Sequence, residues 1–193
     1  GGGQTAGRAG GPGGTIGHPD RSVFPEQGCT RLAVAEFEVA GAPLAVRHVE
    51  GRPLSLLRCP EGRTDACFFQ KHLGPGAPEA IGAVEVPEED GIDVYPTVRD
   101  GAGLVGLVQL GVLELHPWGS RADRLERPDR LILDLDPAPD VDLERVKYAA
   151  RVGRAVLADR GLEAFVQTTG GPGRHVAAPR ARRPDADRPM RSP

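Results

Sequence analysis

Short apolar runs separated by turn-forming segments are the main pattern along this chain of 193 residues. Residues 52–60 and 66–72 are rich in apolar and aromatic side chains, and the turn-forming string "EGRTD" separates them. Runs of this length bounded by turn residues are typical of strands. We therefore expect two short strands here.

The segment 101–119 changes its period midway. Leu104, Leu107 and Val108 lie near helical spacing, and the string "LELHPW" then alternates apolar and polar positions. Helical spacing followed by alternation predicts a helix that feeds a strand.

A third strand is expected over 130–136, "RLILDLD", and a helix is expected over 140–161. Asp140 or Asp142 can cap the start of this helix, and Gly161 is suited to its end. The apolar face of the helix should contain Leu143, Val146, Ala150 and Leu157.

The string "LEAFVQT" (162–168) predicts the next strand and completes a strand, helix, strand unit. Helices interleaved with strands indicate an α/β or α+β fold, in which helices flank a mixed β-sheet.

The two ends of the chain differ in composition from this body. Residues 1–15 are dominated by glycine, which predicts a flexible linker. Residues 180–193 are rich in arginine and proline, which predicts a disordered tail. One folded domain is therefore expected over residues 16–179.

Charge and cysteine content narrow the functional classes. The chain has 24 basic and 27 acidic residues, so any binding to nucleic acid must come from a local patch rather than a global field. Cys29, Cys59 and Cys67 lack metal-ligand spacing, and we interpret them as reduced thiols of a cytoplasmic protein. No apolar run approaches the ~20 residues that a membrane-spanning helix needs.

Asp134 and Asp136 are the first candidates for chemistry. Alternation on a strand puts both carboxylates on one face, with α-carbons about 6.5 Å apart at a rise of ~3.3 Å per residue. Such a pair before Pro137 suits Mg²⁺ or Mn²⁺. A solvated strand edge explains the same acids, and glycosyltransferases and aspartate-nucleophile phosphatases share the motif. Ala138 stands where those phosphatases have threonine or valine.

Two further segments place polar side chains at expected strand ends. Glu114 and His116 share a face by alternation, and Pro117 stops the strand. The string "QTTGGPGRHV" forms a glycine-rich turn whose backbone N–H groups can approach phosphates. Its side-chain donors are Thr168, Thr169, Arg174 and His175. A structural histidine and an ordinary loop are the alternatives.

Five strings have an order and spacing known from one family: "HPDRSVFPEQGCTR", "GRPLSLLRCPEG", "CFFQKH", "GLVGLVQLGVLELHPWGSRADRLERPDRLILDLDP" and "TTGGPGRHV". In these strings, from about His18 to Pro179, the chain resembles the polymerase domain of bacterial DNA ligase D. That domain belongs to the archaeal and eukaryotic primase superfamily and acts in non-homologous end joining. The resemblance implies a primase-like fold that is incomplete at the C-terminus.

The resemblance implies template-dependent nucleotidyl transfer at DNA ends or gaps, with ribonucleotides preferred. Asp134 and Asp136 would hold the catalytic Mn²⁺ or Mg²⁺ ions, which bridge the triphosphate and activate the primer 3′-hydroxyl. The nucleoside triphosphate would be contacted by His116, Thr169, Gly170, Gly171 and His175.

The resemblance also implies a surface for DNA. His18, Arg21 and Arg31 correspond to the family's pocket for a 5′-phosphate, although ordinary surface arginines are the alternative. Phe69 corresponds to an aromatic that stacks on DNA, and Lys71 on the same face could meet a backbone phosphate. Alternation should bury one of the neighbours Phe68 and Phe69. Arg52 and Arg58 are expected to add to this basic patch.

The chain departs from the family pattern at several points. Thr169 replaces a serine, and Pro172 replaces a lysine and removes an N–H from the phosphate-binding turn. The family's third metal-binding aspartate belongs to a later strand, and Asp185 and Asp187 stand in the arginine- and proline-rich tail. A DNA 5′-phosphate end-binding module without catalysis is therefore the alternative function.

The resemblance further implies partners and a location. A Ku-type end-binding protein is the expected partner, and ligase and nuclease modules are expected in the parent protein. The expected location is the bacterial cytoplasm, in association with the nucleoid.

Overall fold

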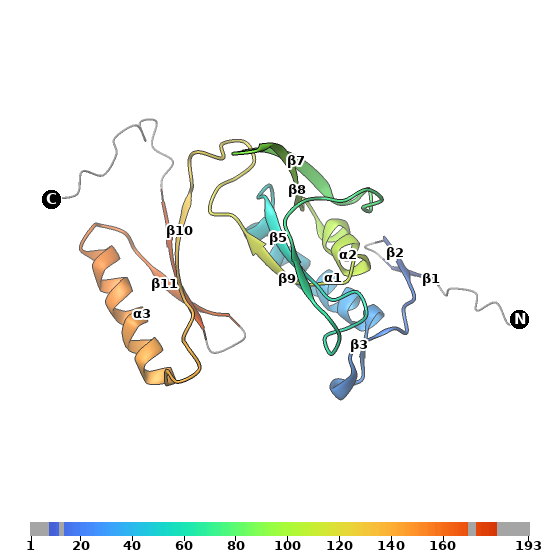
Figure 1. The fold of residues 1–193 in the computed structure, drawn as a ribbon, viewed down its shortest axis with the longest axis horizontal. Coiled ribbons are helices and arrows are strands. Elements are labelled where there is room, and N and C mark those ends of the chain that lie inside the picture. Colours follow the sequence, from blue (N-terminus) through green and yellow to red (C-terminus); the bar gives the residue numbers. More distant parts are fainter. Residues whose placement is uncertain (1–7, 12–13, 170–172, 181–193) are drawn as a thin grey trace, which may run out of the picture. The chain divides into compact units, whose positions relative to one another are not determined.

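The protein's structure, a computed structural model, describes residues 8–11, 14–169 and 173–180. The chain forms two compact units, the first ending at Trp118 and the second beginning at Gly119 (Figure 1). Strand β1 (Arg8–Gly11) lies within the expected linker and β2 (Gly14–Gly17) crosses its boundary. Most of the expected tail lies outside the described residues. The boundaries at residues 15 and 179 stay predictions.

The first unit combines two α-helices with short antiparallel strands. Its helices are α1 (Arg31–Val49) and α2 (Gly101–Gln109), and a short 3₁₀ helix, η1, spans Pro25–Gln27. Besides β1 and β2, its paired strands are β3 (Ser22–Phe24) with β4 (Cys29–Thr30), and β7 (Gly82–Glu88) with β8 (Gly91–Thr97). A three-stranded sheet has the order β6 (Phe68–Gln70), β5 (Leu54–Arg58), β9 (Val112–Pro117).

One apolar cluster joins this three-stranded sheet to the helices α1 and α2. Its buried members are Val49, Leu54, Leu56, Ile81, Val98, Leu104, Leu107 and Val112. Alternate residues of β5 and β9 face away from the cluster, where Glu114 and His116 are exposed. The predicted helix and strand over 101–119 are therefore confirmed as α2 and β9, and the open face of the sheet carries the polar side chains.

Helix α1 is an element that the sequence pattern does not predict. Phe37 and Leu44 are 73% and 70% exposed, so the apolar residues of this helix do not form a single face. Pro43 lies inside the helix, and a proline in the sequence argues against a helix at that position. The start of the helix is nevertheless well defined, because Thr30 Oγ1 accepts a hydrogen bond of 3.3 Å from the N–H of Ala33.

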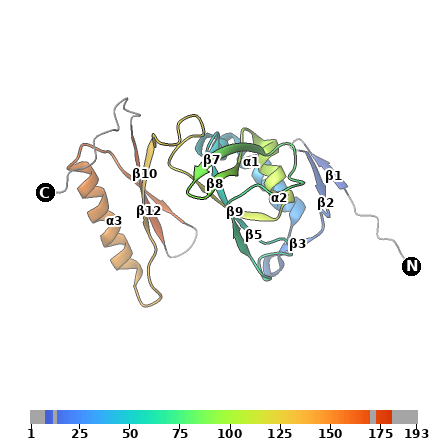
Figure 2. The ribbon, with the colours of Figure 1, turned by 45° about the horizontal axis from the view of Figure 1, so that its top comes forward.

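The second unit consists of a three-stranded sheet and one helix. In chain order its elements are β10 (Arg130–Leu135), α3 (Leu143–Ala158), β11 (Phe165–Thr168) and β12 (Arg174–Pro179). Strand β12 lies between β10 and β11 and is antiparallel to both, so β10 and β11 run parallel to each other. Helix α3 covers one face of this sheet (Figure 1, Figure 2). The predicted α/β (α+β) class is confirmed.

Helix α3 agrees with its predicted caps and with most of its predicted face. Asp142, one of the two candidate caps, accepts a 2.8 Å hydrogen bond from the N–H of Arg145. Gly161 has φ +73° in the turn that follows the last helical residue, Ala158, and this conformation favours glycine. Three of the four predicted face residues are buried, namely Val146, Ala150 and Leu157. The prediction is wrong for Leu143, which is 45% exposed because it lies in the first turn, outside the packed cluster.

Two other predictions are wrong in the region of β6. Both Phe68 and Phe69 are exposed, at 47% and 67%, because β6 is a three-residue strand at the edge of its sheet. The expectation of reduced thiols is wrong for Cys59 and Cys67, which form a disulfide, while Cys29 is free. The antiparallel pairing of β5 and β6 brings the two α-carbons of the disulfide to 4.4 Å.

Substitution of Leu56 should reveal how strongly the first unit depends on its apolar cluster. Leu56 is fully buried, so Leu56→Ala should lower the free energy of unfolding by about 2–5 kcal/mol. Leu44→Ala removes the same atoms from a 70% exposed position and should change the free energy of unfolding by less than ~0.5 kcal/mol. Urea unfolding followed by circular dichroism measures both values, and equal losses would contradict this assignment of the core.

Candidate functional site

Asp134 lies on the face of β10 that is turned away from α3. Its neighbours Leu133 and Leu135 pack against the cluster that contains residues of α3, so alternation puts Asp134 on the opposite face. The side chain of Asp134 is 67% exposed, and Asp136 is exposed just after the strand ends. Both carboxylates are therefore open to solvent at the carboxyl end of β10.

His175 lies directly opposite Asp134 on the neighbouring strand β12. The two side chains are in contact, with 3.4 Å between His175 Nε2 and Asp134 Oδ1. His175 is the more protected partner, with a side chain that is 33% exposed. The expected metal ligand and the expected nucleotide contact are thus cross-strand neighbours.

The glycine-rich turn joins β11 to β12 at this same end of the sheet. Thr169 is exposed and follows β11, whereas Gly170, Gly171 and Pro172 lie outside the described residues. Gly173 is buried. A side chain there would come within 3.1 Å of Thr169 Oγ1 and 3.2 Å of the Leu135 carbonyl oxygen. The missing Cβ therefore allows the backbone of Gly173 to lie close to the end of β10, where the aspartates are.

This part of the second unit offers ligands for both a cation and an anion. Carboxylate oxygens such as those of Asp134 and Asp136 are preferred ligands of Mg²⁺ and Mn²⁺. An imidazole and a hydroxyl, from His175 and Thr169, can donate hydrogen bonds to phosphate oxygens. The donor set fits a divalent cation with a bound polyphosphate.

In the first unit, the open face of sheet β6, β5, β9 carries His116 and Phe69. Their rings meet edge to face, with centroids 5.6 Å apart and planes at 63°. His116 Nε2 also lies 3.4 Å from Glu114 Oε2, which confirms the predicted sharing of a face by these two residues. Lys71 is exposed one residue after β6. An exposed aromatic ring beside a lysine is a surface that suits a base and a backbone phosphate.

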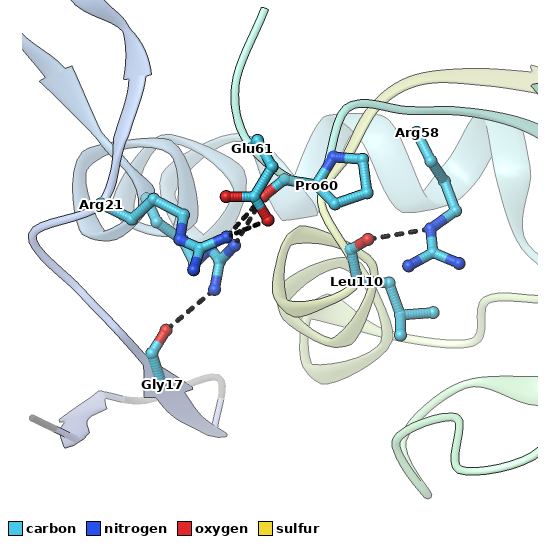
Figure 3. Close-up of polar contacts among 7 residues, drawn as sticks. Gly17, Arg21, Arg58, Pro60, Glu61 and Leu110 are labelled. Carbon is cyan, nitrogen blue, oxygen red and sulfur yellow. Dashed lines mark hydrogen bonds and ion pairs between the residues drawn. The ribbon is translucent and has the colours of Figure 1, made fainter. Parts of the chain in front are cut away.

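The expectation that Arg52 and Arg58 extend this basic surface is wrong for Arg52, which is buried, and stays a prediction for Arg58, which is half-buried. Arg52 is only 2% exposed, and its Nη1 donates to the carbonyl of Trp118 at 3.1 Å. Arg58 Nε donates to the carbonyl of Leu110 at 2.9 Å (Figure 3), and its Nη1 donates to Gln70 at 2.7 Å. Burial lowers the pKa of Arg58. Both guanidinium groups therefore make hydrogen bonds that link β5 and its flanking residues to neighbouring segments.

Arg21 and Arg31 converge on one backbone carbonyl. Arg21 Nη1 donates to Pro60 O at 2.9 Å and to Glu61 Oε1 at 2.8 Å (Figure 3). Arg31 Nη2 donates to the same carbonyl at 3.3 Å, and its Nη1 donates to Gly17 O at 3.1 Å. Arg31 is only 6% exposed, so the alternative of an ordinary surface arginine does not hold for it.

Electrostatics within this pair follow from the burial of Arg31. Burial lowers the pKa of Arg31, the neighbouring Arg21 lowers it further, and Glu61 opposes both effects. His18 is exposed at the turn before Arg21, and its backbone carbonyl accepts a hydrogen bond from the Arg21 N–H at 3.1 Å. The structure thus brings the expected phosphate-binding residues to the start of α1, and it adds Glu61, which the sequence analysis did not single out.

A second cluster of metal-ligating side chains was also not expected. Atoms of His72, Glu88 and Asp93 that could bind a metal all lie within 4.8 Å of one another. His72 Nε2 is 3.4 Å from Asp93 Oδ2 and 3.8 Å from Glu88 Oε1. Tyr95 donates a hydrogen bond to Glu88, which lowers the pKa of that carboxyl, and packs edge to face on the His72 ring. Only the acidic hairpin "EEDG" at 88–91 hinted at this cluster in the sequence.

Comparison with protein families and solved structures identifies related proteins. The model of the family described as LigD, primase-polymerase domain, matches residues 30–192. The match contains both aspartates, the glycine-rich turn and Arg31, and it begins after His18 and Arg21.

Curated relatives and a solved structure agree with this family. The multifunctional non-homologous end joining protein LigD of Pseudomonas aeruginosa is 38% identical over 92% of this chain, which spans 21% of that protein. The protein of the same description from Mycolicibacterium smegmatis is 31% identical over 85% of the chain, which spans 22% of it. The polymerase domain of Mycobacterium tuberculosis ligase D, solved in complex with DNA, superposes with a TM-score of 0.77. It is 30% identical, with 85% of this chain and 60% of that chain covered. Among the described residues, none of the helices is long and apolar enough to cross a membrane.

The environment of Tyr95 gives a pH dependence that can be measured. Burial, and then the hydrogen bond to Glu88, raise the pKa of Tyr95 to about 12. In the unfolded chain a tyrosine has a pKa near ~10. The neutral Tyr95 side chain should therefore contribute its full share to the free energy of unfolding below pH ~10, and this contribution should be lost as the pH rises to about 12. Absorbance at 295 nm should show an ionisation near pH 12 that Tyr95→Phe removes and Tyr148→Phe leaves. An ionisation of Tyr95 near pH ~10 would contradict the arrangement.

Proposed function

Because this chain belongs to the family of LigD primase-polymerase domains, we propose that it is a template-dependent DNA nucleotidyltransferase. It adds nucleotides, preferentially ribonucleotides, at DNA ends or gaps during non-homologous end joining. The observation that carries the proposal is the cross-strand pair of Asp134 and His175, with Asp136 and Thr169 exposed at the same end of the sheet.

The metal that fits this site is a divalent cation with a preference for oxygen ligands. Asp134 and Asp136 would hold Mn²⁺, with Mg²⁺ as the alternative, because both carboxylates are exposed at one strand end. A bound ion supplies charge neutralisation of the triphosphate and acidifies the attacking 3′-hydroxyl. His175 orients Asp134 through the 3.4 Å contact between their side chains.

The incoming nucleoside triphosphate would be held by side chains that donate hydrogen bonds. We assign His175, Thr169 and the backbone of Gly170 and Gly171 to its phosphates, and His116 to a further contact. Pro172 cannot donate a backbone N–H in this turn, so we expect weaker binding of the triphosphate than a lysine at this position would give. In-line attack of the primer 3′-hydroxyl on the α-phosphorus then forms the new phosphodiester and releases pyrophosphate.

The DNA would be held by the first unit. Arg21, with Arg31 and His18, would bind the 5′-phosphate on the far side of a gap. Phe69 would stack on a base next to the gap, and Lys71 would contact a backbone phosphate. The solved relative was determined in complex with DNA, which supports a DNA substrate.

The wider setting rests on the family resemblance and is part of the same proposal. We place the chain in the bacterial cytoplasm at the nucleoid, in a parent protein with ligase and nuclease modules, and with a Ku-type partner. Catalytically inactive binding of DNA 5′-phosphates is the second candidate function, because the convergence of Arg21 and Arg31 on Pro60 does not involve the aspartates. The phosphatase and glycosyltransferase alternatives lose their basis, since the family match contains both aspartates.

Primer extension on a gapped duplex with a 5′-phosphate tests the proposal. With Mn²⁺ and ribonucleotides, Asp134→Ala and Asp136→Ala should each lower the rate by roughly 100-fold or more, since each removes a metal ligand. Asp140→Ala, an exposed acid in the turn after β10, is the matched control and should retain the wild-type rate.

The same assay separates the two candidate functions. If Asp134→Ala and Asp136→Ala both extend the primer at the wild-type rate, the proposed site is contradicted. Folded wild-type protein that binds the gapped duplex without extending it would favour the end-binding module. Substitution of deoxyribonucleotides for ribonucleotides should lower the rate, and a higher rate would contradict the proposed preference.

A further inference from the structure

We propose that Glu61 is a competing anion built into the 5′-phosphate pocket, which a DNA 5′-phosphate must displace from Arg21. The inference rests on the proposed role of Arg21 and Arg31 in binding that phosphate. It assigns to Glu61 the role of a competitor: its carboxylate weakens binding of every anion at Arg21, and a strongly charged phosphate displaces it.

The contact itself lies where a phosphate would bind. Glu61 Oε1 is 2.8 Å from Arg21 Nη1, and the two side chains are 68% and 31% exposed. Among the residues that the structure describes, this is the one carboxylate in an ion pair with Arg21. A carboxylate and a phosphate use the same N–H donors of a guanidinium, so the two anions compete for Arg21.

Arg21 does not need Glu61 in order to stay in place. Its Nη1 also donates to Pro60 O at 2.9 Å, and the buried Arg31 holds the same carbonyl at 3.3 Å (Figure 3). When the Glu61 side chain leaves, the Pro60 carbonyl still orients the Arg21 guanidinium. The pocket therefore keeps its shape when its own anion is exchanged for a phosphate.

Hydrogen bonds and a disulfide hold the backbone on both sides of Glu61 in the sequence. Upstream, the N–H of Cys59 donates to Gly111 O at 2.7 Å, and Cys59 is bonded to Cys67. Downstream, the N–H of Arg63 donates to Val23 O at 2.9 Å. Gly62 has φ +114°, and a Cβ there would come within 2.9 Å of the Ser22 carbonyl oxygen. The exchange thus requires rotation of the Glu61 side chain, not movement of the loop.

Charge explains why the exchange favours a phosphate. Arg21 and Arg31 share one carbonyl, and Glu61 supports the charge of Arg31 against burial and against Arg21. A terminal phosphate carries a charge of about −1.5 to −2 at pH 7 and three acceptor oxygens, so it can replace a carboxylate here. A 5′-hydroxyl carries no charge and cannot.

Binding of matched DNA ends to the full chain tests this role. Fluorescence anisotropy gives the dissociation constants of a gapped duplex with a 5′-phosphate and of the same duplex with a 5′-hydroxyl, at one salt concentration. Glu61→Gln should tighten binding of the phosphorylated duplex about three- to tenfold. Glu26→Gln makes the same change of net charge at an exposed site on η1 and should leave the preference for the phosphate as in wild type.

A third variant separates failure of this inference from failure of the pocket. Arg21→Ala should abolish the preference for the 5′-phosphate. If Arg21→Ala abolishes it and Glu61→Gln binds no more tightly than Glu26→Gln, the role of Glu61 is overturned while the pocket stands. If Arg21→Ala retains the preference, both are overturned.

A measurement on the wild-type chain covers the case in which Glu61→Gln does not fold. The side-chain carboxyl carbon of Glu61 should shift in its NMR spectrum when the phosphorylated duplex is added, and should not shift with the 5′-hydroxyl duplex. An equal shift with both duplexes, or none with either, would overturn the proposal.

Discussion

The antiparallel register between β10 and β12 is the constraint on which the candidate catalytic site depends. It sets Asp134 opposite His175 and leaves Leu133 and Leu135 to pack with α3. A slip of one residue would turn Asp134 toward the helix and bury an unpaired carboxylate. Packing against α3 therefore maintains the register, and the register places the acids and the histidine at one edge. Gly173, directly before β12, lacks a Cβ and so lies close to the Leu135 carbonyl oxygen at the same edge.

In the first unit, two guanidinium groups are buried, and hydrogen bonds offset the cost of removing their charge from water. Arg31 and Arg52 are 6% and 2% exposed, and each guanidinium donates to backbone carbonyls. A buried guanidinium is costly unless it is hydrogen-bonded, and backbone carbonyls supply acceptors without bringing a second charge into the interior. The consequence for function is that Arg21, the more exposed neighbour, is presented at a fixed position beside the Pro60 carbonyl.

Local patterns in the sequence predict some of these features and miss others for physical reasons. Helix α3 and its cap Asp142 could be predicted, because amphipathic spacing and capping are local. Helix α1 could not, since its apolar residues surround the axis and Pro43 interrupts it. The pairing of Cys59 with Cys67 and the burial of Arg31 depend on which strands and loops meet, and spacing along the chain does not encode that. The proposed roles of the site residues come from the family resemblance, which local patterns alone did not supply.

The central claim is that a divalent cation binds at the aspartates of β10 and not at the second acidic cluster. Mn²⁺ broadens the NMR signals of nearby nuclei, and the chain has five histidines whose imidazole signals can be followed separately. His175 lies 3.4 Å from Asp134, whereas His72 lies 3.4 Å from Asp93. We predict that the signals of His175 broaden at the lowest Mn²⁺ concentrations and that Asp134→Ala prevents this. Broadening of His72 first, with His175 unaffected, would contradict this prediction.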